Sequence, residues 1–135
     1  MTLRYVRRSI SLSAYCRSDA VGLVYKVVSQ AEWGEAQRDG MFRGAEIDRR
    51  DGYIHLSNGE QVEKTVSLYF ADRDDLVLVA LDAERLGEAL KWEPSRGGAL
   101  FPHLYATLPL DLVAWSKHFS SRDAQALRAL IADGF

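Results

Sequence analysis

Residues 23–40 read LVYKVVSQAEWGEAQRDG, and this stretch carries the signals for one strand and one helix in direct succession. Its first residues are mostly β-branched, aromatic or aliphatic, which is typical of a strand. Ser29 can cap a helix, and Glu32 three residues later completes a capping box. Gly40 provides the left-handed residue that often ends a helix. The pattern therefore predicts a strand up to Ser29 and a helix over residues 30–39.

Short strands and helices are also expected along the rest of the chain. Residues 76–81 form an uninterrupted apolar run, which predicts a strand buried on both faces. Residues 43–52 are charged and turn-prone, and we expect a loop there. The other expected strands cover residues 53–57 and 111–116, with an extended segment over 89–93 and a loop or edge strand over 101–105. The other expected helices are one that begins at a capping box of Ser57 and Glu60 and runs to about residue 70, a single turn over 82–87 and one that begins at residues 120–123. The predicted fold class is α+β, with five or six short strands and about three helices.

The composition fits one domain with a sizeable core. The chain has 135 residues, of which 47% are apolar and 27% are charged, and no apolar run is long enough for a membrane span. Its single cysteine, Cys16, cannot form an intramolecular disulfide, so we expect a reducing compartment and a cytoplasmic location. The formal net charge of −2 gives no electrostatic reason to expect nucleic acid or a membrane as a partner.

The N-terminal segment differs in charge from the rest of the chain. Residues 1–23 contain four arginines and one acidic residue, whereas the remaining residues contain 13 basic and 18 acidic side chains. The segment is rich in serine, as targeting peptides are, but it has no sustained apolar region and no small-residue cleavage site. We therefore expect a poorly ordered extension over residues 1–22 and one α+β domain over residues 23–135. An extra strand or arm and a targeting role are the alternatives for the extension.

Three short segments place polar side chains where they can meet a ligand. In the first segment, Tyr53, His55 and Ser57 share one face of the predicted strand. Imidazole and hydroxyl groups can hydrogen-bond the oxygens of ribose or phosphate. The alternatives are that Ser57 serves as a helix cap and that His55 is a structural histidine.

The second segment, residues 91–98, reads KWEPSRGG. Pro94 forces an extended backbone at Glu93, and we expect this carboxyl group beside Trp92 to have a raised pKa or a well-defined hydrogen bond. Arg96 and the two glycines after it can bring a cation and backbone N–H groups to a phosphate or a carboxylate. The alternative is an exposed hairpin in which Glu93 and Arg96 pair with each other.

The third segment is FPHLY at residues 101–105. His103 and Tyr105 share a face if this segment is extended, framed by apolar packing from Phe101 and Leu104. A ligand contact and a loop pinned by its aromatic side chains are equally compatible with this pattern.

The sequence lacks the motifs that are typical of several other classes of enzyme and binding site. The sequence contains no P-loop, no dinucleotide-binding glycine motif and no nucleophile elbow. His55, His103 and His118 do not have the spacing of a helical zinc site, and we predict no metal centre. Cys16 has no nearby partner for a catalytic thiol. The acidic balance of residues 24–135 argues against a nucleic-acid groove.

Taken together, ordered motifs across the chain resemble those of the DUF952 family. The motifs are YKVV at 25–28 with AEW at 31–33, DGYIHLS at 51–57, WEP at 92–94 with RGG at 96–98, and FPHLY at 101–105. The resemblance covers residues 23–118 and leaves the N-terminal extension outside. It implies a fold similar to that of ADP-ribosyltransferases, with two small mixed or antiparallel sheets around a cleft that binds NAD.

The resemblance also implies roles for individual residues. Lys26 stands where that fold has a His or an Arg, the strand over 53–57 corresponds to its second motif, and Glu93 corresponds to its carboxylate. Glu93 would then hydrogen-bond the nicotinamide ribose while the glycosidic bond breaks through an oxocarbenium-like state. The candidate site comprises Glu93 and His55 as catalytic groups, with Lys26, Tyr53, Ser57, Trp92, Arg96, Gly97, His103 and Tyr105 as ligand-binding groups.

Three functions follow as hypotheses. The first is an ADP-ribosyltransferase-like enzyme that acts on NAD, or on a related nucleotide or phosphorylated ribose. The second is a module that binds a small anionic or nucleotide ligand without turnover. The third is a small interaction domain whose polar motifs only hold loops in place. The sequence makes no prediction of the oligomeric state.

Overall fold

The computed structural model describes residues 22–133. The expected N-terminal extension therefore lies outside the described residues, apart from Gly22. Within the described range, the protein is a mixed α+β structure, as the sequence predicts.

The first strand and helix form where the sequence predicts them. β1 (Leu23–Ser29) runs directly into α1 (Gln30–Asp39). The Glu32 N–H donates to the Ser29 hydroxyl at 3.0 Å, and the Ser29 N–H donates to the Glu32 carboxylate at 3.0 Å, which confirms the capping box. Gly40 ends the helix in the left-handed conformation, with a φ of 76°.

The remaining elements follow in chain order. They are β2 (Met41–Phe42), α2 (Glu46–Asp51), β3 (Ile54–His55), β4 (Ser57–Asn58), α3 (Val62–Tyr69), β5 (Leu76–Asp82), α4 (Ala83–Leu86), β6 (Leu90–Pro94), β7 (Leu100–Leu104), β8 (Leu108–Pro109), β9 (Val113–Phe119) and α5 (Ala124–Ala132). Single 3-10 turns occur at η2 (Gly87–Ala89), η3 (Arg96–Gly98) and η4 (Leu110–Leu112).

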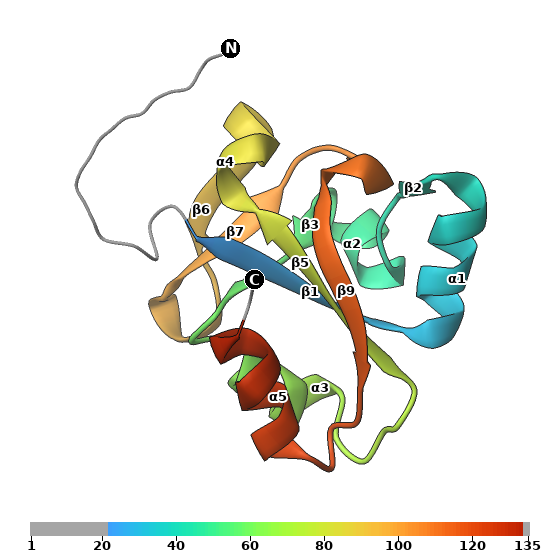
Figure 1. The fold of residues 1–135 in the computed structure, drawn as a ribbon. Helices are drawn as coiled ribbons and strands as arrows, with labels where there is room; N and C mark the ends of the chain where they lie inside the picture. Colours follow the sequence, from blue (N-terminus) through green and yellow to red (C-terminus); the bar gives the residue numbers. More distant parts are fainter. Residues whose placement is uncertain (1–21, 134–135) are drawn as a thin grey trace.

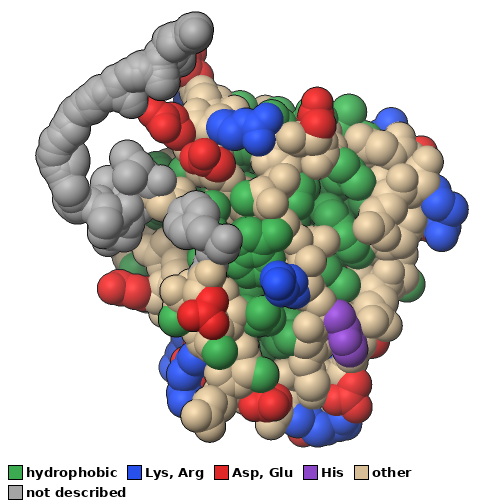
Figure 2. All heavy atoms as spheres, in the orientation of Figure 1, with side chains coloured by type: hydrophobic (Ala, Val, Ile, Leu, Met, Phe, Trp, Pro, Cys, Tyr) green, Lys and Arg blue, Asp and Glu red, His purple; other side chains and the backbone are tan. Residues whose placement is uncertain are grey.

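The strands form three antiparallel sheets (Figure 1). Sheet A has the order β4-β1-β5-β9, sheet B pairs β2 with β8, and sheet C has the order β3-β7-β6. β1 and β5 are the two inner strands of sheet A, and both faces of β5 are buried, which confirms the prediction from its apolar run. Apolar side chains gather over the middle of the molecule in this view, and most charged side chains lie toward its margin (Figure 2).

Sheet A separates two apolar cores. Core 1 lies on the face that carries Val24 and Val28, where the sheet packs against α1 and against side chains of sheets B and C. Core 2 lies on the opposite face, which carries Tyr25 and Val27 and packs against α3 and α5 (Figure 1). Because side chains alternate along a strand, Lys26 of β1 points toward core 1, where it is 8% exposed.

The structure corrects the expected number of elements. Residues 22–133 contain nine strands in three sheets and five α-helices, instead of five or six strands in two sheets and about three helices. Residues 43–52, expected as a loop, contain α2. Residues 101–105, expected as a loop or an edge strand, lie mostly in β7, which is the central strand of sheet C. Sheets A and C meet through the apolar side chains of core 1.

The second predicted capping box does not form. Ser57 lies in β4, where it pairs with Tyr25 of β1. Asn58 stabilises the turn before the next helix instead, because its Oδ1 accepts hydrogen bonds from the N–H groups of Glu60 and Gln61, both at 2.9 Å. The helix that follows, α3, therefore begins at Val62.

Candidate functional site

Sheet C carries polar ring side chains on its outer face, away from core 1. Ile54 and Leu104 are directly opposite each other in the register of β3 and β7, and both pack in core 1. Their neighbours His55 and His103 are also directly opposite each other, so they point to the other face of the sheet.

Tyr53 lies at the centre of this group of rings. Its ring centroid is 4.2 Å from that of His103 at an interplanar angle of 26°, which is a stacked arrangement. The same centroid lies 4.6 Å from that of His55 and 5.2 Å from that of Tyr105. His103 is consequently only 3% exposed although it lies on the outer face. We call Tyr53, His55, His103 and Tyr105 the ring cluster.

Glu93 of β6 binds two members of the ring cluster. Its Oε1 accepts from His103 Nδ1 at 2.7 Å and from the Tyr105 hydroxyl at 2.8 Å. Because an ionised carboxylate can only accept hydrogen bonds, the proton of this His103 contact lies on Nδ1. The hydrogen bonds from His103 and Tyr105 lower the pKa of Glu93, and the contact with Glu93 raises the pKa of Tyr105. The expected hydrogen bond of Glu93 is confirmed, whereas a raised pKa is wrong because the hydrogen bonds outweigh desolvation.

His55 is held between two carboxylates of α2. Its Nδ1 lies 2.6 Å from Asp48 Oδ1, and its Nε2 lies 3.0 Å from Asp51 Oδ2. Each ring nitrogen of His55 is therefore within hydrogen-bond distance of one carboxylate oxygen of α2. The sequence prediction missed both aspartates, since residues 43–52 show no apolar periodicity and were expected as a loop.

Asp48 also forms a buried ion pair with Lys26. Lys26 Nζ lies 2.9 Å from Asp48 Oδ2 and donates to the carbonyl oxygen of His55 at 3.1 Å. Burial alone would raise the pKa of Asp48, but the hydrogen bonds from His55 and the charge of Lys26 lower this pKa to about 2. Lys26 therefore joins sheet A to α2 and β3. Direct contact of Lys26 with a ligand stays a prediction.

Ser57 and Arg96 meet in a second group, through a residue that the sequence prediction missed. Arg96 Nη1 donates to the Thr65 hydroxyl at 3.1 Å, and Thr65 Oγ1 lies 3.3 Å from Ser57 Oγ. The Arg96 guanidinium also lies over the ring of Phe101, 4.8 Å from its centroid. Glu93 binds the ring cluster instead, so the alternative in which Glu93 and Arg96 pair with each other is wrong.

The last two candidate residues lie apart from both groups. Trp92 alternates with Glu93 along β6, so it points to the opposite face of sheet C, where it is 44% exposed. Gly97 lies in the η3 turn with a φ of 68°, and a Cβ there would meet no other atom within 4 Å. The structure therefore brings Glu93 to the ring cluster and leaves Trp92 and Gly97 outside it.

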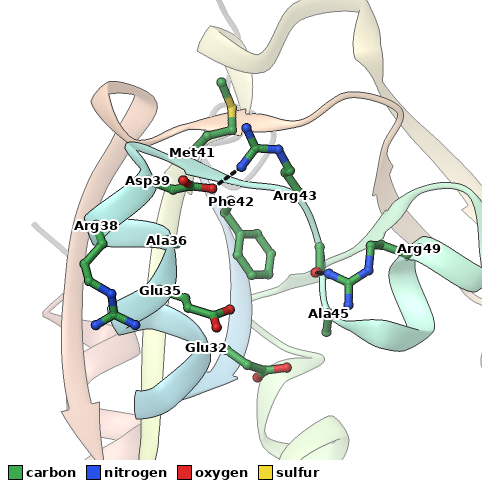
Figure 3. A pocket seen from close by; sticks show the side chains of 11 residues that line it. Glu32, Glu35, Ala36, Arg38, Asp39, Met41, Phe42, Arg43, Ala45 and Arg49 are labelled. Atoms are coloured by element: carbon green, nitrogen blue, oxygen red, sulfur yellow. Dashed lines mark hydrogen bonds and ion pairs between the residues drawn. The ribbon is translucent and has the colours of Figure 1, made fainter.

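A separate pocket of about 360 Å³ opens between α1, β2 and the segment that leads into α2. Glu32 and Glu35 point into it from α1, and Phe42 contributes part of its wall (Figure 3). Ala45 also lines this pocket, and its N–H donates to Asp48 Oδ2 at 2.8 Å. None of the ten candidate site residues predicted from the sequence lines this pocket, so it is distinct from the ring cluster.

None of the helices in residues 22–133 is long and apolar enough to cross a membrane. The same part of the chain contains no group of three or more His, Cys, Asp and Glu side chains that could hold a metal ion.

The fold and the site together define a small α+β protein with three antiparallel sheets and a carboxylate–histidine–tyrosine cluster on one of them. The chain belongs to the DUF952 family, described as a protein of unknown function, and the family model matches residues 27–116. This confirms the family that the sequence motifs indicate.

The solved structures that resemble this protein include those of protein CC0527 from Caulobacter crescentus. The X-ray crystal structure of CC0527 is 44% identical in sequence, with a TM-score of 0.72 over 78% of this chain and 97% of that chain. The solution NMR structure is 49% identical, with a TM-score of 0.67 over 73% of this chain and 84% of that chain. No curated protein sequence matches the chain.

Proposed function

We propose that the outer face of sheet C binds the ribosyl part of NAD or of a related nucleotide, and that Glu93 is the carboxylate of an ADP-ribosyltransferase-like reaction. The observation that supports this proposal is the contact of Glu93 from β6 with His103 and Tyr105. His103 in turn contacts the rings of Tyr53 and His55. Oε1 of Glu93 accepts both hydrogen bonds, and Oε2 has no partner among residues 22–133. Oε2 is therefore available to a ligand hydroxyl.

The proposed reaction transfers a ribosyl group from nicotinamide to an acceptor. The bond between the anomeric carbon and the nicotinamide nitrogen breaks, and its electron pair leaves on neutral nicotinamide. An acceptor hydroxyl or a water molecule then adds to the oxocarbenium-like carbon and releases one proton to solvent. Glu93 is ionised because its pKa is lowered, so it would stabilise this cation and orient the ribose hydroxyl. His103 and Tyr105 act as positioning residues, since they hold the carboxylate.

A binding module without turnover is the second candidate function. The ring cluster stacks on itself, and Tyr53 covers His103, which leaves this ring little access to a reacting atom. An exposed sheet face of this kind can hold a nucleotide by stacking and hydrogen bonds without excluding water from a reaction. The ligand class, a small anion or a nucleotide, is the same in both proposals.

Replacing Glu93 with glutamine tests the enzymatic proposal, because the amide keeps the shape of the side chain and removes its charge. We expect the wild-type protein to bind NAD in titration calorimetry and to release nicotinamide, measured by chromatography. Glu93→Gln should slow this release about a hundredfold, the scale at which loss of one transition-state contact acts. Glu88→Gln, an exposed carboxylate in the turn before β6, is the matched control and should leave the rate unchanged.

The outcomes separate the two candidate functions. NAD binding that raises the melting temperature without release of nicotinamide would support the binding module. Absence of NAD binding by the wild-type protein, or an unchanged rate in Glu93→Gln, would rule out the enzymatic proposal.

A further inference from the structure

Arg96 is a cation held in place without a carboxylate. No ion pair joins its guanidinium to an acidic side chain in residues 22–133, although Glu93 lies only three residues earlier. Its position is fixed instead by the hydrogen bond to Thr65 at 3.1 Å and by the ring of Phe101 beneath it. A guanidinium has five N–H groups, and this hydrogen bond uses one of them. Arg96 therefore presents several oriented donors and an uncompensated positive charge.

Two hydroxyl groups extend this donor set. Thr65 on α3 receives the Arg96 hydrogen bond, and its Oγ1 lies 3.3 Å from Ser57 Oγ. Ser57 is 7% exposed, so we assign its hydroxyl to the orientation of Thr65 and not to direct contact with a ligand. The group thus combines the Arg96 guanidinium with the Thr65 hydroxyl, which Ser57 orients, and this donor set suits the several oxygens of a phosphate.

The position of Arg96 relates this donor set to Glu93. In the register of sheet C, Glu93 lies directly opposite Phe101, the residue whose ring supports the Arg96 guanidinium. Directly opposite residues of antiparallel strands share one face of a sheet, with their Cβ atoms about 5 Å apart. Phe101 itself is only 7% exposed, so a ligand would lie above it, with a hydroxyl on the Glu93 carboxylate and a phosphate on the Arg96 guanidinium.

We propose that Arg96 and Thr65, oriented by Ser57, form a phosphate subsite beside Glu93, and that the ligand is a ribose 5-phosphate unit rather than an unphosphorylated nucleoside. This inference rests on the proposed function, in which Glu93 binds the ribose. It assigns Ser57 a positioning role and adds Thr65 to the candidate site.

Two probes that differ only in their 5′-phosphate test the subsite. We expect the wild-type protein to bind nicotinamide mononucleotide at least about tenfold more tightly than nicotinamide riboside in titration calorimetry, the gain from one charge-assisted contact. Arg96→Gln should weaken binding of the mononucleotide about tenfold and leave that of the riboside unchanged. Thr65→Val should weaken binding of the mononucleotide by a smaller factor, and it keeps the charge of Arg96.

The matched control is Lys64→Gln, which removes an exposed positive charge next to Thr65 on α3 and should change neither affinity. Melting temperatures of all variants establish that they are folded. If Arg96→Gln unfolds, Thr65→Val and Arg96→Lys carry the test, because a lysine keeps the charge and loses the planar donor set.

A third probe, ribose 5-phosphate, separates this inference from the proposed function. Equal affinities of the wild-type protein for the mononucleotide and the riboside, with nicotinamide release still slowed in Glu93→Gln, would overturn the phosphate subsite and leave the proposed function intact. Binding of ribose 5-phosphate that depends on Arg96, without binding of any nicotinamide compound, would overturn the proposed function and support the subsite. Absence of binding of all three probes would overturn both.

Discussion

Replacing Asp48 with asparagine is expected to lower the free energy of unfolding by about 3–5 kcal/mol, as removal of one partner from a buried ion pair does. Lys26 would then stay in core 1 without its counter-ion, with a side chain that is 9% exposed. The asparagine would also disturb the acceptors of the N–H groups of Ala45 and His55, which donate to the Asp48 carboxylate at 2.8 and 3.0 Å. Urea unfolding followed by circular dichroism measures the change.

Two companion variants identify the cause of this loss. Asp39→Asn removes a carboxylate that also pairs with a cation, Arg43, but in an exposed position, so it should cost less than about 1 kcal/mol. The double variant Lys26→Met/Asp48→Asn removes the buried charge as well, and we expect it to recover part of the stability. A double variant that is less stable than Asp48→Asn alone would contradict the proposed cost of an unpaired Lys26.

The Asp48 carboxylate also makes the free energy of unfolding depend on pH. The pKa of Asp48 is about 2 in the folded protein and about 3.9 in an unfolded chain, so the folded state favours the ionised form. The stabilisation of about 2–3 kcal/mol is complete above about pH 5 and is lost as the pH falls through about 2. Other carboxylates also titrate in this range. The difference in free energy of unfolding between the wild-type protein and Asp48→Asn therefore isolates the contribution of Asp48 to the pH dependence. We expect that difference to shrink by about 2 kcal/mol between pH 5 and 2 in acid titrations of unfolding.

The elements that the sequence predicted correctly depend on local interactions. The capping box of Ser29 and Glu32 and the left-handed Gly40 involve residues close together in the chain, so their pattern determines α1. α2 also ends at a left-handed glycine, Gly52, but Ala45 before it has no side-chain oxygen that could cap it, and its Asp48 is stabilised by Lys26 from a distant strand. Ser57 has a cap-like pattern, but pairing with β1 prevents that role.

The candidate site was predictable in part for the same reason. Strand alternation predicts that Tyr53 lies with His55 and that His103 lies with Tyr105: the rings of Tyr53 and His55 are in contact, and His103 and Tyr105 both bind Glu93. Ser57, predicted on the same face as Tyr53 and His55, lies instead in β4 of sheet A. The pairing of β3 with β7, which brings the two pairs together, is a long-range contact that neither segment specifies alone. Asp51 and Thr65 follow from such contacts too, so nothing in their local sequence marked them.

Gly44→Ala is the other substitution with a large expected effect, because Gly44 closes the loop around the Asp48 carboxylate. Its φ is 106°, in the region that favours glycine, and a Cβ at this position would lie 2.9 Å from the Cβ of Asp48. That atom cannot swing away as the end of a long side chain can, so strain and overpacking should add to a loss of about 3 kcal/mol in the free energy of unfolding.

Gly52→Ala is the matched control for this substitution, at the other end of α2. Gly52 has a similar φ of 91°, but a Cβ there would meet no other atom within 4 Å. It should therefore cost only the backbone strain, about 1–2 kcal/mol. The difference between the two variants in urea unfolding measures the close approach of Asp48 to Gly44, and equal losses would contradict it. Because Asp48 also binds His55 Nδ1, Gly44→Ala should shift the NMR signals of the His55 ring, whereas Gly52→Ala should change them less.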